Sequence, residues 1–242
     1  MPTDVAPFIA IDGPVGSGKT AVGRRLAARL GHMFLDTGVM YRAVTYQALQ
    51  KKVSLSDPGA LTQLASTTDM ELRGDAGEEC RVIVDAGDVT DELRSPEVER
   101  SVSTVASVPG VREVLVRMQR EVAARGKIVM VGRDIGTVVL SGAGLKIYLD
   151  ASVDIRARRR YDQLQESGSD IEYETVLKDL KNRDDLDSSR AIAPLMAATD
   201  AVTLPTDDLG LQEVVDRLES LARGADYSNT LDNSGDSGHD PR

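Results

Sequence analysis

The sequence predicts an α/β protein in which a five-stranded parallel sheet is flanked by helices. Apolar runs of strand length alternate along the chain with stretches of helical apolar spacing, which is typical of a parallel sheet covered on both faces. A glycine-rich loop joins the first predicted strand to the first predicted helix. One segment, near residues 69–89, breaks this alternation and predicts a smaller inserted subdomain.

The first strand and the helix after it are marked by a change of hydrophobic period. Residues 8–11 form an apolar run. Apolar residues then recur at helical spacing at Val22, Leu26 and Leu30, and Gly31 is expected to end this helix. The remaining strands are expected wherever apolar residues run without interruption, because a strand buried on both faces needs them at every position. In chain order these strands are residues 33–35, 128–131, 145–149 and 201–204.

The inserted subdomain is expected to contain small antiparallel strands. Residues 70–72 and 81–84 have strand character, and the turn sequence Gly-Asp-Ala-Gly at residues 74–77 separates them. We include in the same insertion the helix that follows Ser95-Pro96. These features divide the chain into a core of residues 5–61 and 103–223 and an insertion of residues 62–102.

Two later helices are predicted from apolar residues that lie three or four positions apart. The first helix carries Val111, Val114, Leu115, Met118 and Val122. The last helix carries Leu211, Val214, Val215, Leu218 and Leu221. Residues 224–242 are rich in Asp, Ser, Asn and Gly without apolar periodicity, so we expect a disordered acidic tail.

The composition excludes several classes of protein. The chain of 242 residues has a net charge of −10 and a pI near 4.8, which argues against nucleic-acid binding. A single cysteine, Cys80, and two histidines leave no disulfide framework and no basis for a zinc site. The N-terminus lacks the basic segment of a signal peptide, and no apolar run has the length of a membrane span. We therefore expect a cytoplasmic protein without membrane or nucleic-acid partners.

The glycine-rich loop is a complete phosphate-loop motif of the form G-x-x-x-x-G-K-[ST], set between a strand and a helix. Its glycines let backbone N–H groups approach phosphate oxygens, and the dipole of the following helix favours the same anion. Lys19 is expected to reach the β- and γ-phosphates, and the Thr20 hydroxyl is expected to bind Mg²⁺. The loop predicts binding of a nucleoside triphosphate by Gly13, Pro14, Val15, Gly16, Ser17, Gly18, Lys19 and Thr20.

Polar residues also follow the second and third strands, at the sheet edge where open α/β proteins bind ligands. Asp36 and Thr37 end the second strand, and Arg42 lies in the next helix, where it suits a second phosphate. A helix N-cap beside a solvated arginine is the alternative. Arg133 and Asp134 follow the third strand, where buried charges need partners. A ligand role is favoured there, and an ion pair between these two residues is the alternative.

Arginines gather on a helix predicted after the fourth strand. Arg156, Arg159 and Arg160 share one face of this helix, at spacings of three and four residues. A solvated basic face is the usual explanation of such a run, but three converging arginines repel one another unless an anion lies between them. We interpret residues 152–168 as a lid that closes over transferring phosphates, where Arg neutralises developing charge.

A second charged cluster, Arg183, Asp187 and Arg190, is expected at a helix end and the turn after it. The neighbouring residues 182–185, Asn-Arg-Asp-Asp, superficially resemble the guanine-reading N-K-x-D motif of GTPases. That motif should follow a strand, whereas the residues before this one, at 176–180, have helical spacing. We therefore reject a GTPase.

Together these motifs resemble those of the bacterial cytidylate kinases, which are nucleoside monophosphate kinases with a phosphate-loop fold. The resemblance runs from about residue 8 to residue 221. Besides the phosphate loop it includes D-T-G-x-x-Y-R at residues 36–42, G-R-D-I-G-T-V-V at 132–139 and R-D-x-L-D-S-x-R-A at 183–191. The resemblance implies that the insertion is an enlarged monophosphate-binding subdomain.

The resemblance also implies a role for each matching residue. The acceptor phosphate would be held by Thr37, Arg42 and Arg133. The cytosine ring would be surrounded by Ser103, Arg112, Asp134 and Arg190. The ribose and phosphate would lie close to Arg183 and Asp187. The triphosphate would be clamped by the lid arginines, Arg156, Arg159 and Arg160.

One position departs from the family pattern. The family usually has Asp or Glu at the end of the third strand, where it helps to organise the water shell of Mg²⁺, and this chain has Val131. Asp12, which ends the first strand, and Thr20 remain as candidate partners of the metal.

The expected activity is transfer of a phosphoryl group from ATP with Mg²⁺ to CMP or dCMP by a cytoplasmic monomer. One alternative keeps the enzyme class and changes the acceptor to UMP, dTMP or shikimate. The insertion and the arginine and aspartate residues implied around the cytosine ring argue against this alternative. A second alternative is a non-catalytic nucleotide sensor, which only Val131 motivates. Lys19 and the lid arginines disfavour a sensor, because a sensor has no transition state to stabilise.

Overall fold

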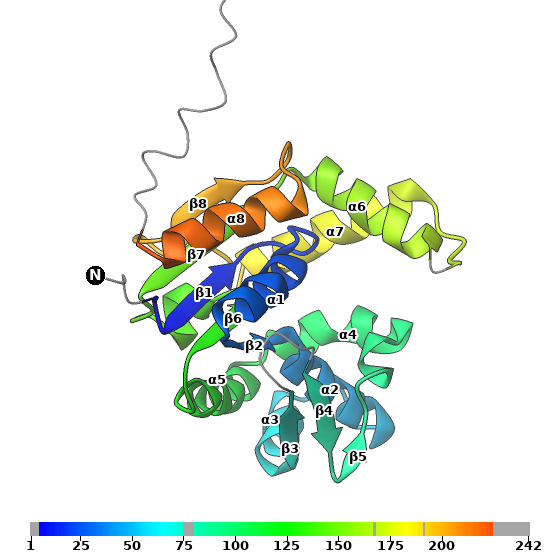
Figure 1. The fold of residues 1–242 in the computed structure, drawn as a ribbon. Helices are drawn as coiled ribbons and strands as arrows, with labels where there is room; N and C mark the ends of the chain where they lie inside the picture. The colour runs from blue at the N-terminus through cyan, green and yellow to red at the C-terminus, as the bar shows by residue number, and fades with distance from the viewer. Residues whose placement is uncertain (1–4, 75–79, 167, 191, 225–242) are drawn as a thin grey trace, which may run out of the picture.

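The structure is a computed structural model that describes residues 5–74, 80–166, 168–190 and 192–224 (Figure 1). Its central sheet has the strand order β2-β6-β1-β7-β8, and every neighbouring pair is parallel. The strands are β1 (Phe8–Asp12), β2 (Met33–Asp36), β6 (Ile128–Gly132), β7 (Leu145–Asp150) and β8 (Val202–Pro205). Each of them lies on one of the predicted apolar runs, so the predicted five-stranded parallel sheet is confirmed.

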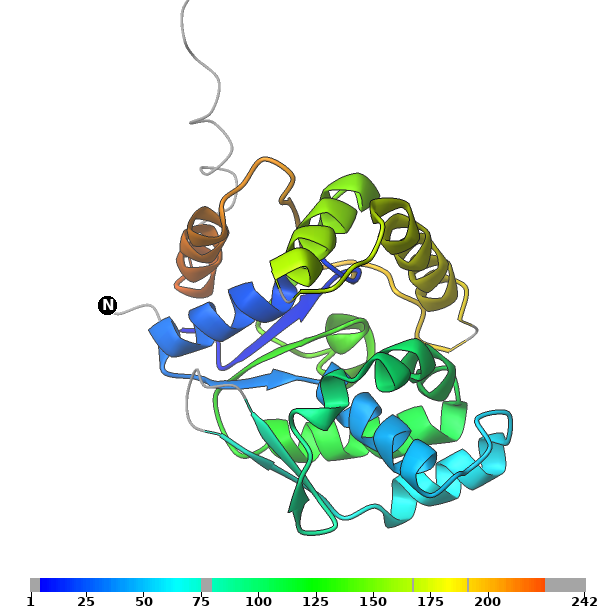
Figure 2. The same cartoon turned by 90° about the vertical axis from the view of Figure 1, so that its right-hand side faces the viewer.

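Helices cover both faces of the sheet (Figures 1 and 2). The covering helices are α1 (Lys19–Leu30), α2 (Gly38–Gln50), α5 (Pro109–Ala123) and α8 (Leu211–Ala222). Side chains of β1 alternate between two buried clusters. Ile9 and Ile11 pack with α1 and α8 on one face, and Ala10 packs with α2 and α5 on the other. Burial on both faces explains why the strand has no polar residue before its end.

A smaller antiparallel sheet lies between α2 and α5 in the chain, as the insertion predicted. The sheet consists of β3 (Met70–Arg73), β4 (Arg81–Val84) and β5 (Gly87–Asp88). Helix α3 (Pro58–Thr67) precedes it in the chain, and the 3₁₀ turn η1 (Glu92–Arg94) and helix α4 (Pro96–Ala106) follow it. Val82 and Val84 of β4 pack against Ala43 of α2. The predicted turn at 74–77 falls mostly within residues 75–79, outside the described part of the chain. The boundaries of the insertion, residues 62 and 102, stay a prediction.

Two helices after β7 form a separate hairpin. α6 (Val153–Glu166) and α7 (Tyr173–Ser188) pack on each other through Ala157, Val176 and Leu180. Figure 1 shows that the hairpin extends past the end of the sheet and faces α4. Within the described ranges, no helix combines the length and the apolar character needed to cross a membrane. The expected disordered tail begins at residue 224, and residues 225–242 of it lie outside the described part of the chain.

Candidate active site

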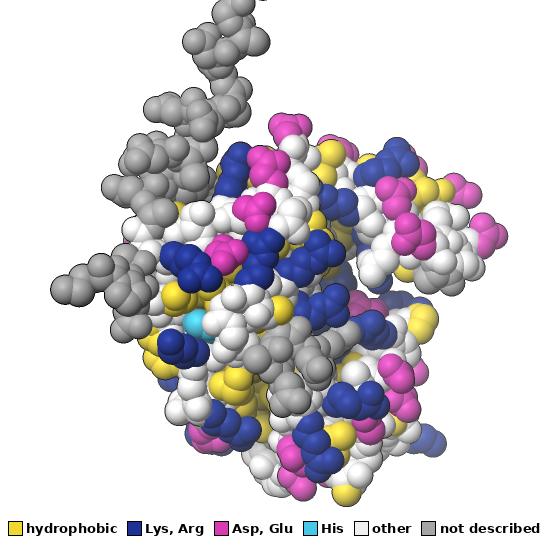
Figure 3. Space-filling view, viewed as in Figure 1, with side chains coloured by type: hydrophobic (Ala, Val, Ile, Leu, Met, Phe, Trp, Pro, Cys, Tyr) yellow, Lys and Arg dark blue, Asp and Glu magenta, His cyan; other side chains and the backbone are white. Residues whose placement is uncertain are grey.

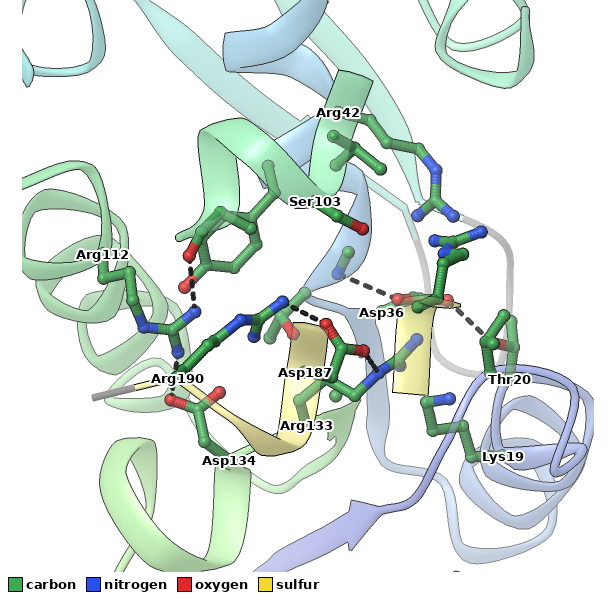
Figure 4. Close-up of a pocket in the computed structure, with 18 of the residues that line it drawn as sticks. Lys19, Thr20, Asp36, Arg42, Ser103, Arg112, Arg133, Asp134, Asp187 and Arg190 are labelled. Atoms are coloured by element: carbon green, nitrogen blue, oxygen red, sulfur yellow. Dashed lines mark hydrogen bonds and ion pairs between the residues drawn. The ribbon is translucent and has the colours of Figure 1, made fainter. Parts of the chain in front are cut away.

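One cavity at the carboxyl ends of β2 and β6 gathers the predicted acceptor residues (Figure 4). Its empty volume, open mouth included, is about 790 Å³, within the roughly 300–1,000 Å³ of small-molecule sites. It is lined by every residue predicted to bind the acceptor, namely Thr37, Arg42, Ser103, Arg112, Arg133, Asp134, Arg183, Asp187 and Arg190. Lys19 and Thr20 line it too, so the phosphate loop and the acceptor residues face one space.

The cavity is cationic although the protein is acidic. Its positively charged lining residues are Lys19, Arg42, Arg112, Arg133, Arg183 and Arg190. Its acidic lining residues are Asp36, Asp134 and Asp187. Figure 3 shows this face of the molecule hollowed between α6 and α4, with Lys and Arg side chains beside the hollow. Such a concentration of positive charge suits a ligand that carries phosphate.

The phosphate loop has the backbone geometry of an anion site. Gly16 and Gly18 have φ of 79° and 90°, a region that other residues rarely adopt, and Gly18 is the N-cap of α1. The Lys19 ammonium donates to the Pro14 carbonyl at 2.9 Å. Burial, reinforced by nearby Arg133, lowers the pKa of Lys19 well below its ordinary value. A phosphate anion beside this buried cation would relieve that penalty.

Asp36 has a role that the sequence did not indicate. Its Oδ2 accepts from the Thr20 hydroxyl at 2.7 Å, and its Oδ1 accepts from the Gly38 amide at 2.9 Å. The carboxylate therefore joins the phosphate loop to the start of α2. The signal available in the sequence was its place at the end of β2, which pairs with β6 and brings it to the ligand edge of the sheet.

Neither Asp12 nor Val131 lines the cavity, and both are buried. Both carboxylate oxygens of Asp12 accept backbone amides at 2.7 Å, from Ile135 and Gly136, and burial raises its pKa to about 6. Val131 is fully buried, and a Cβ added to Gly23 of α1 would lie 2.5 Å from its Cγ1. Of the two candidates for the metal's surroundings, only Thr20 lines the cavity, and its carboxylate partner is Asp36 rather than Asp12.

The charged residues after β6 pair with distant partners and not with each other. Arg133 donates to Asp187 at 2.8 Å, and Arg190 donates to the other oxygen of Asp187. Asp134 accepts from Arg112, and both of these side chains are buried. The alternative of an ion pair between Arg133 and Asp134 is therefore not what the structure contains. Although burial raises the pKa of Asp187, Arg133 and Arg190 hold it below its ordinary value.

Thr37 and two arginines complete the acceptor side. The Thr37 hydroxyl donates to the Val131 carbonyl at 3.0 Å. Arg42 Nε and Arg183 Nη1 donate to the two oxygens of one carboxylate, that of Glu99, at 2.7 and 3.2 Å. Sequence reasoning missed Glu99. The available signal was its position one helical turn before Ser103 on α4, which places both residues on the same face.

The three lid arginines are not gathered at one point. Arg156 is buried and donates to the carbonyl oxygens of Ala151 and Val15, at 2.9 and 3.0 Å, and to Asp184 at 2.6 Å. Arg159 donates to the Thr206 carbonyl at 2.6 Å, and Arg160 donates to Gln163 at 2.9 Å. None of the three lines the acceptor cavity. Their roles toward the triphosphate stay predictions.

A second cavity also adjoins the phosphate loop. It has an empty volume of about 520 Å³ and shares Ser17 and Gly18 with the loop. The rest of its lining is Ala21, Val22, Arg159, Thr206, Leu209, Leu211 and Val214. This mixture of apolar side chains with one guanidinium suits a flat, largely apolar ring. Sequence reasoning missed the residues that follow β8, because nothing in their spacing marks them.

The family model and the relatives compared by sequence agree on one family. Residues 9–223 match the family model described as Cytidylate kinase. A cytidylate kinase of Caldanaerobacter subterraneus subsp. tengcongensis is 45% identical over 215 residues, which cover 89% of this chain and 94% of the relative. That of Desulfitobacterium hafniense is 46% identical, with 88% and 91% covered. Among solved structures, a shikimate kinase from Bacteroides thetaiotaomicron is 17% identical with a TM-score of 0.45, over 88% of this chain and 97% of that one.

Proposed function

The chain belongs to the cytidylate kinase family, and from that premise we propose how its residues carry out the reaction. The protein is a nucleoside monophosphate kinase that transfers the γ-phosphoryl group of ATP to CMP or dCMP. The observation that carries the residue assignments is the single cavity, in which all the predicted acceptor residues meet Lys19 and Thr20.

The acceptor phosphate is proposed to bind between Arg42, Arg133 and Arg183. These guanidinium groups line the cavity that Lys19 and Thr20 also line, and each is already oriented by a carboxylate. Arg is suited to this task because its planar fork matches a phosphate group at two points. Fixed cations would hold the acceptor oxygen in line with the phosphorus that it attacks.

The base is proposed to bind deeper in the cavity, near Asp134 and Ser103. Both side chains line the cavity, and the ionised carboxylate and the hydroxyl can each accept from the amino group of cytosine. Arg112 fixes the position of Asp134, because it also donates to the Ala106 carbonyl at 3.1 Å and stacks 5.4 Å from the Tyr41 ring. Uracil presents a carbonyl where cytosine presents the amine, so a fixed acceptor favours cytosine.

The nucleoside of ATP is proposed to occupy the second cavity, with its phosphates on the loop between the two cavities. Arg159 lies in the lining of that cavity, where it can stack on the purine ring. The γ-phosphoryl group would then face the acceptor phosphate in the space that Lys19 and Thr20 share with the acceptor residues.

Catalysis needs no covalent intermediate, because phosphoryl transfer through a loose transition state is a matter of alignment and charge. Lys19 is proposed to stabilise charge on the transferring group. Within the described residues, no cluster of three or more His, Cys, Asp or Glu side chains could hold a metal ion. The Thr20 hydroxyl and the Asp36 carboxylate fit a Mg²⁺ ion that keeps most of its ligands as water and phosphate oxygens. When bound, that ion would neutralise the β- and γ-phosphates.

The test is a set of initial rates with ATP and Mg²⁺ and with CMP, dCMP, UMP or AMP as acceptor. We expect CMP and dCMP to be phosphorylated well above UMP and AMP. The matched control is Lys19→Ala, which should lower kcat by orders of magnitude while ATP still binds, because the lost charge acts mainly in the transition state. ATP binding without transfer to any of these acceptors would identify a nucleotide sensor instead.

We also propose that the protein acts as a cytoplasmic monomer without nucleic-acid partners. Light scattering would test whether it is a monomer, and a DNA-binding assay would test for a nucleic-acid partner.

A further inference from the structure

We propose that Glu99 is a positioning residue that holds Arg42 and Arg183 side by side at the acceptor-phosphate site, a proposal that rests on the function given above. Glu99 lies on α4, whereas Arg42 lies on α2 and Arg183 on α7. The carboxylate therefore joins three helices that approach the cavity from different directions.

The contacts are those of a bridging carboxylate. One oxygen of Glu99 accepts from Arg42 Nε at 2.7 Å, and the other accepts from Arg183 Nη1 at 3.2 Å. The three side chains are about equally enclosed, with exposed fractions of 22–23%. Hydrogen bonds between ionised groups in such a site are shorter and stronger than those between neutral groups.

The arginines need this carboxylate because they crowd one another. Burial lowers the pKa of Arg183, and nearby Arg133 and Arg42 lower it further, whereas Glu99 opposes the shift. Burial raises the pKa of Glu99, but Arg42 and Arg183 together hold it below its ordinary value, so the carboxylate stays ionised. Arg133 already has its own carboxylate, Asp187. Without Glu99, Arg42 and Arg183 would repel each other and move apart toward water.

The bridge leaves the phosphate-facing side of the arginines available. Both Arg42 and Arg183 line the cavity, whereas Glu99 does not. Arg42 uses Nε for Glu99, and its Nη1 lies at the start of α2, where a Cβ added to Gly38 would come within 2.7 Å of it. The Gly38 amide already donates to Asp36, so the Nη groups of Arg42 are what this side offers to an anion. Glu99 acts from behind the two arginines.

Charge removal at Glu99 tests the proposal. In Glu99→Gln we expect KM for CMP and the Kd for CMP to rise about fivefold to tenfold, the scale of one enclosed ion pair. We expect kcat to change less than about twofold, because Glu99 orients the arginines and touches no reacting atom. The inhibition constant of cytidine, which lacks the phosphate, should stay unchanged. Glu99→Asp, which restores the charge, should recover part of the loss. The matched control is Glu213→Gln, which removes the carboxylate of an exposed pair with Arg217 on α8.

Several results would overturn the proposal. Unchanged CMP affinity in Glu99→Gln would mean that the bridge has no role in binding. Tighter CMP binding would mean that Glu99 competes with the phosphate. An equal loss for cytidine and CMP would indicate a general disturbance of α4. Calorimetry with inorganic phosphate, with a non-hydrolysable ATP analogue already bound on the phosphate loop, measures the acceptor anion site without turnover, so it tests Glu99 even if wild-type protein fails to phosphorylate CMP. That failure alone would refute the proposed function and not the role of Glu99.

Discussion

Two of the three carboxylates that line the cavity each serve two partners. Asp187 accepts from both Arg133 and Arg190, and Asp36 accepts from Thr20 and from the Gly38 amide. Sharing lets a few acids orient many cations without cancelling their charge, so the site keeps a net attraction for phosphate. Loss of one such acid would release two groups at once. A substitution of Asp36 or Asp187 is therefore expected to affect ligand binding more than the loss of one hydrogen bond would.

Asp134 provides a test of base selection at the scale of one residue. In Asp134→Asn the side chain keeps its size but can turn its amide to donate to the carbonyl of uracil. We expect the ratio of kcat/KM for CMP to that for UMP to fall at least about tenfold, because a site that depends on one hydrogen bond discriminates strongly. Steady-state kinetics with both acceptors measures it. An equal loss for both would mean that Asp134 only positions Arg112 and that other residues select the base.

Asp12 predicts a pH dependence of stability. Its carboxyl has a pKa of about 6 in the folded protein against 3.8 when unperturbed, because it is buried. The folded state therefore binds the proton more tightly, and ionisation of Asp12 costs stability as the pH rises from about 4 to about 6. Asp12→Asn does not titrate. We expect the unfolding free energy of wild type minus that of the variant to fall by about 2–3 kcal/mol across this window and to stay constant above it.

Urea unfolding of both proteins at intervals between pH 3.5 and 8 gives this difference directly. The variant also loses one acceptor for the amides of Ile135 and Gly136, but that offset does not depend on pH. A difference that is flat between pH 4 and 6 would show that the carboxyl is not perturbed.

At the scale of elements, the strands were more predictable than the arginines. Uninterrupted apolar runs can only be buried strands in a chain with this alternation, and all five were found. The phosphate loop was equally predictable, because its glycines and Lys19 have no other use at that spacing. α3 was missed, although Asp57 caps it and Pro58 begins it, because its residues lie outside the alternation.

Helical spacing did not determine what the lid arginines contact. Arg156, Arg159 and Arg160 share a face of α6, yet they donate to three different segments. Spacing fixes a direction around the helix axis, whereas partners depend on how the helix is tilted against the sheet. Glu99 was missed for the same reason, since only the packing of α4 beside α2 and α7 brings it to the arginines.

The α6–α7 hairpin predicts a change in hydrogen exchange. The first turns of α6 are already held to the phosphate loop by Arg156, whereas Tyr161 and Leu164 in its later turns pack in the cluster that it forms with α7. With ATP and CMP analogues bound together, we expect slower exchange in the last turns of α6 and little change in its first turns. Exchange in α3 serves as the internal control, since none of its residues lines either cavity. Unchanged exchange throughout α6 would argue against a lid.

At the scale of the whole molecule, the site is assembled from parts that are distant in the chain. The phosphate loop, α2, α4, α5, the turn after β6 and α7 each contribute side chains to the same cavity. The motifs predicted these contributors individually, because each follows a strand or begins a helix. Their relative placement required the sheet order, in which β1 lies between β6 and β7.

That sheet order has a consequence for folding during synthesis. β1 is made well before its partners, which lie far along the chain: Phe8 pairs with Ile128, and Ile9 pairs with Leu145. A nascent chain that ends before β6 holds a central strand with two unpaired edges, a state prone to aggregate. The phosphate loop therefore acquires its shape only when the second half of the protein leaves the ribosome. We expect chains arrested before residue 128 to be degraded rapidly by a protease and chains that extend past β8 to resist it, with slow folding set by these long-range pairings.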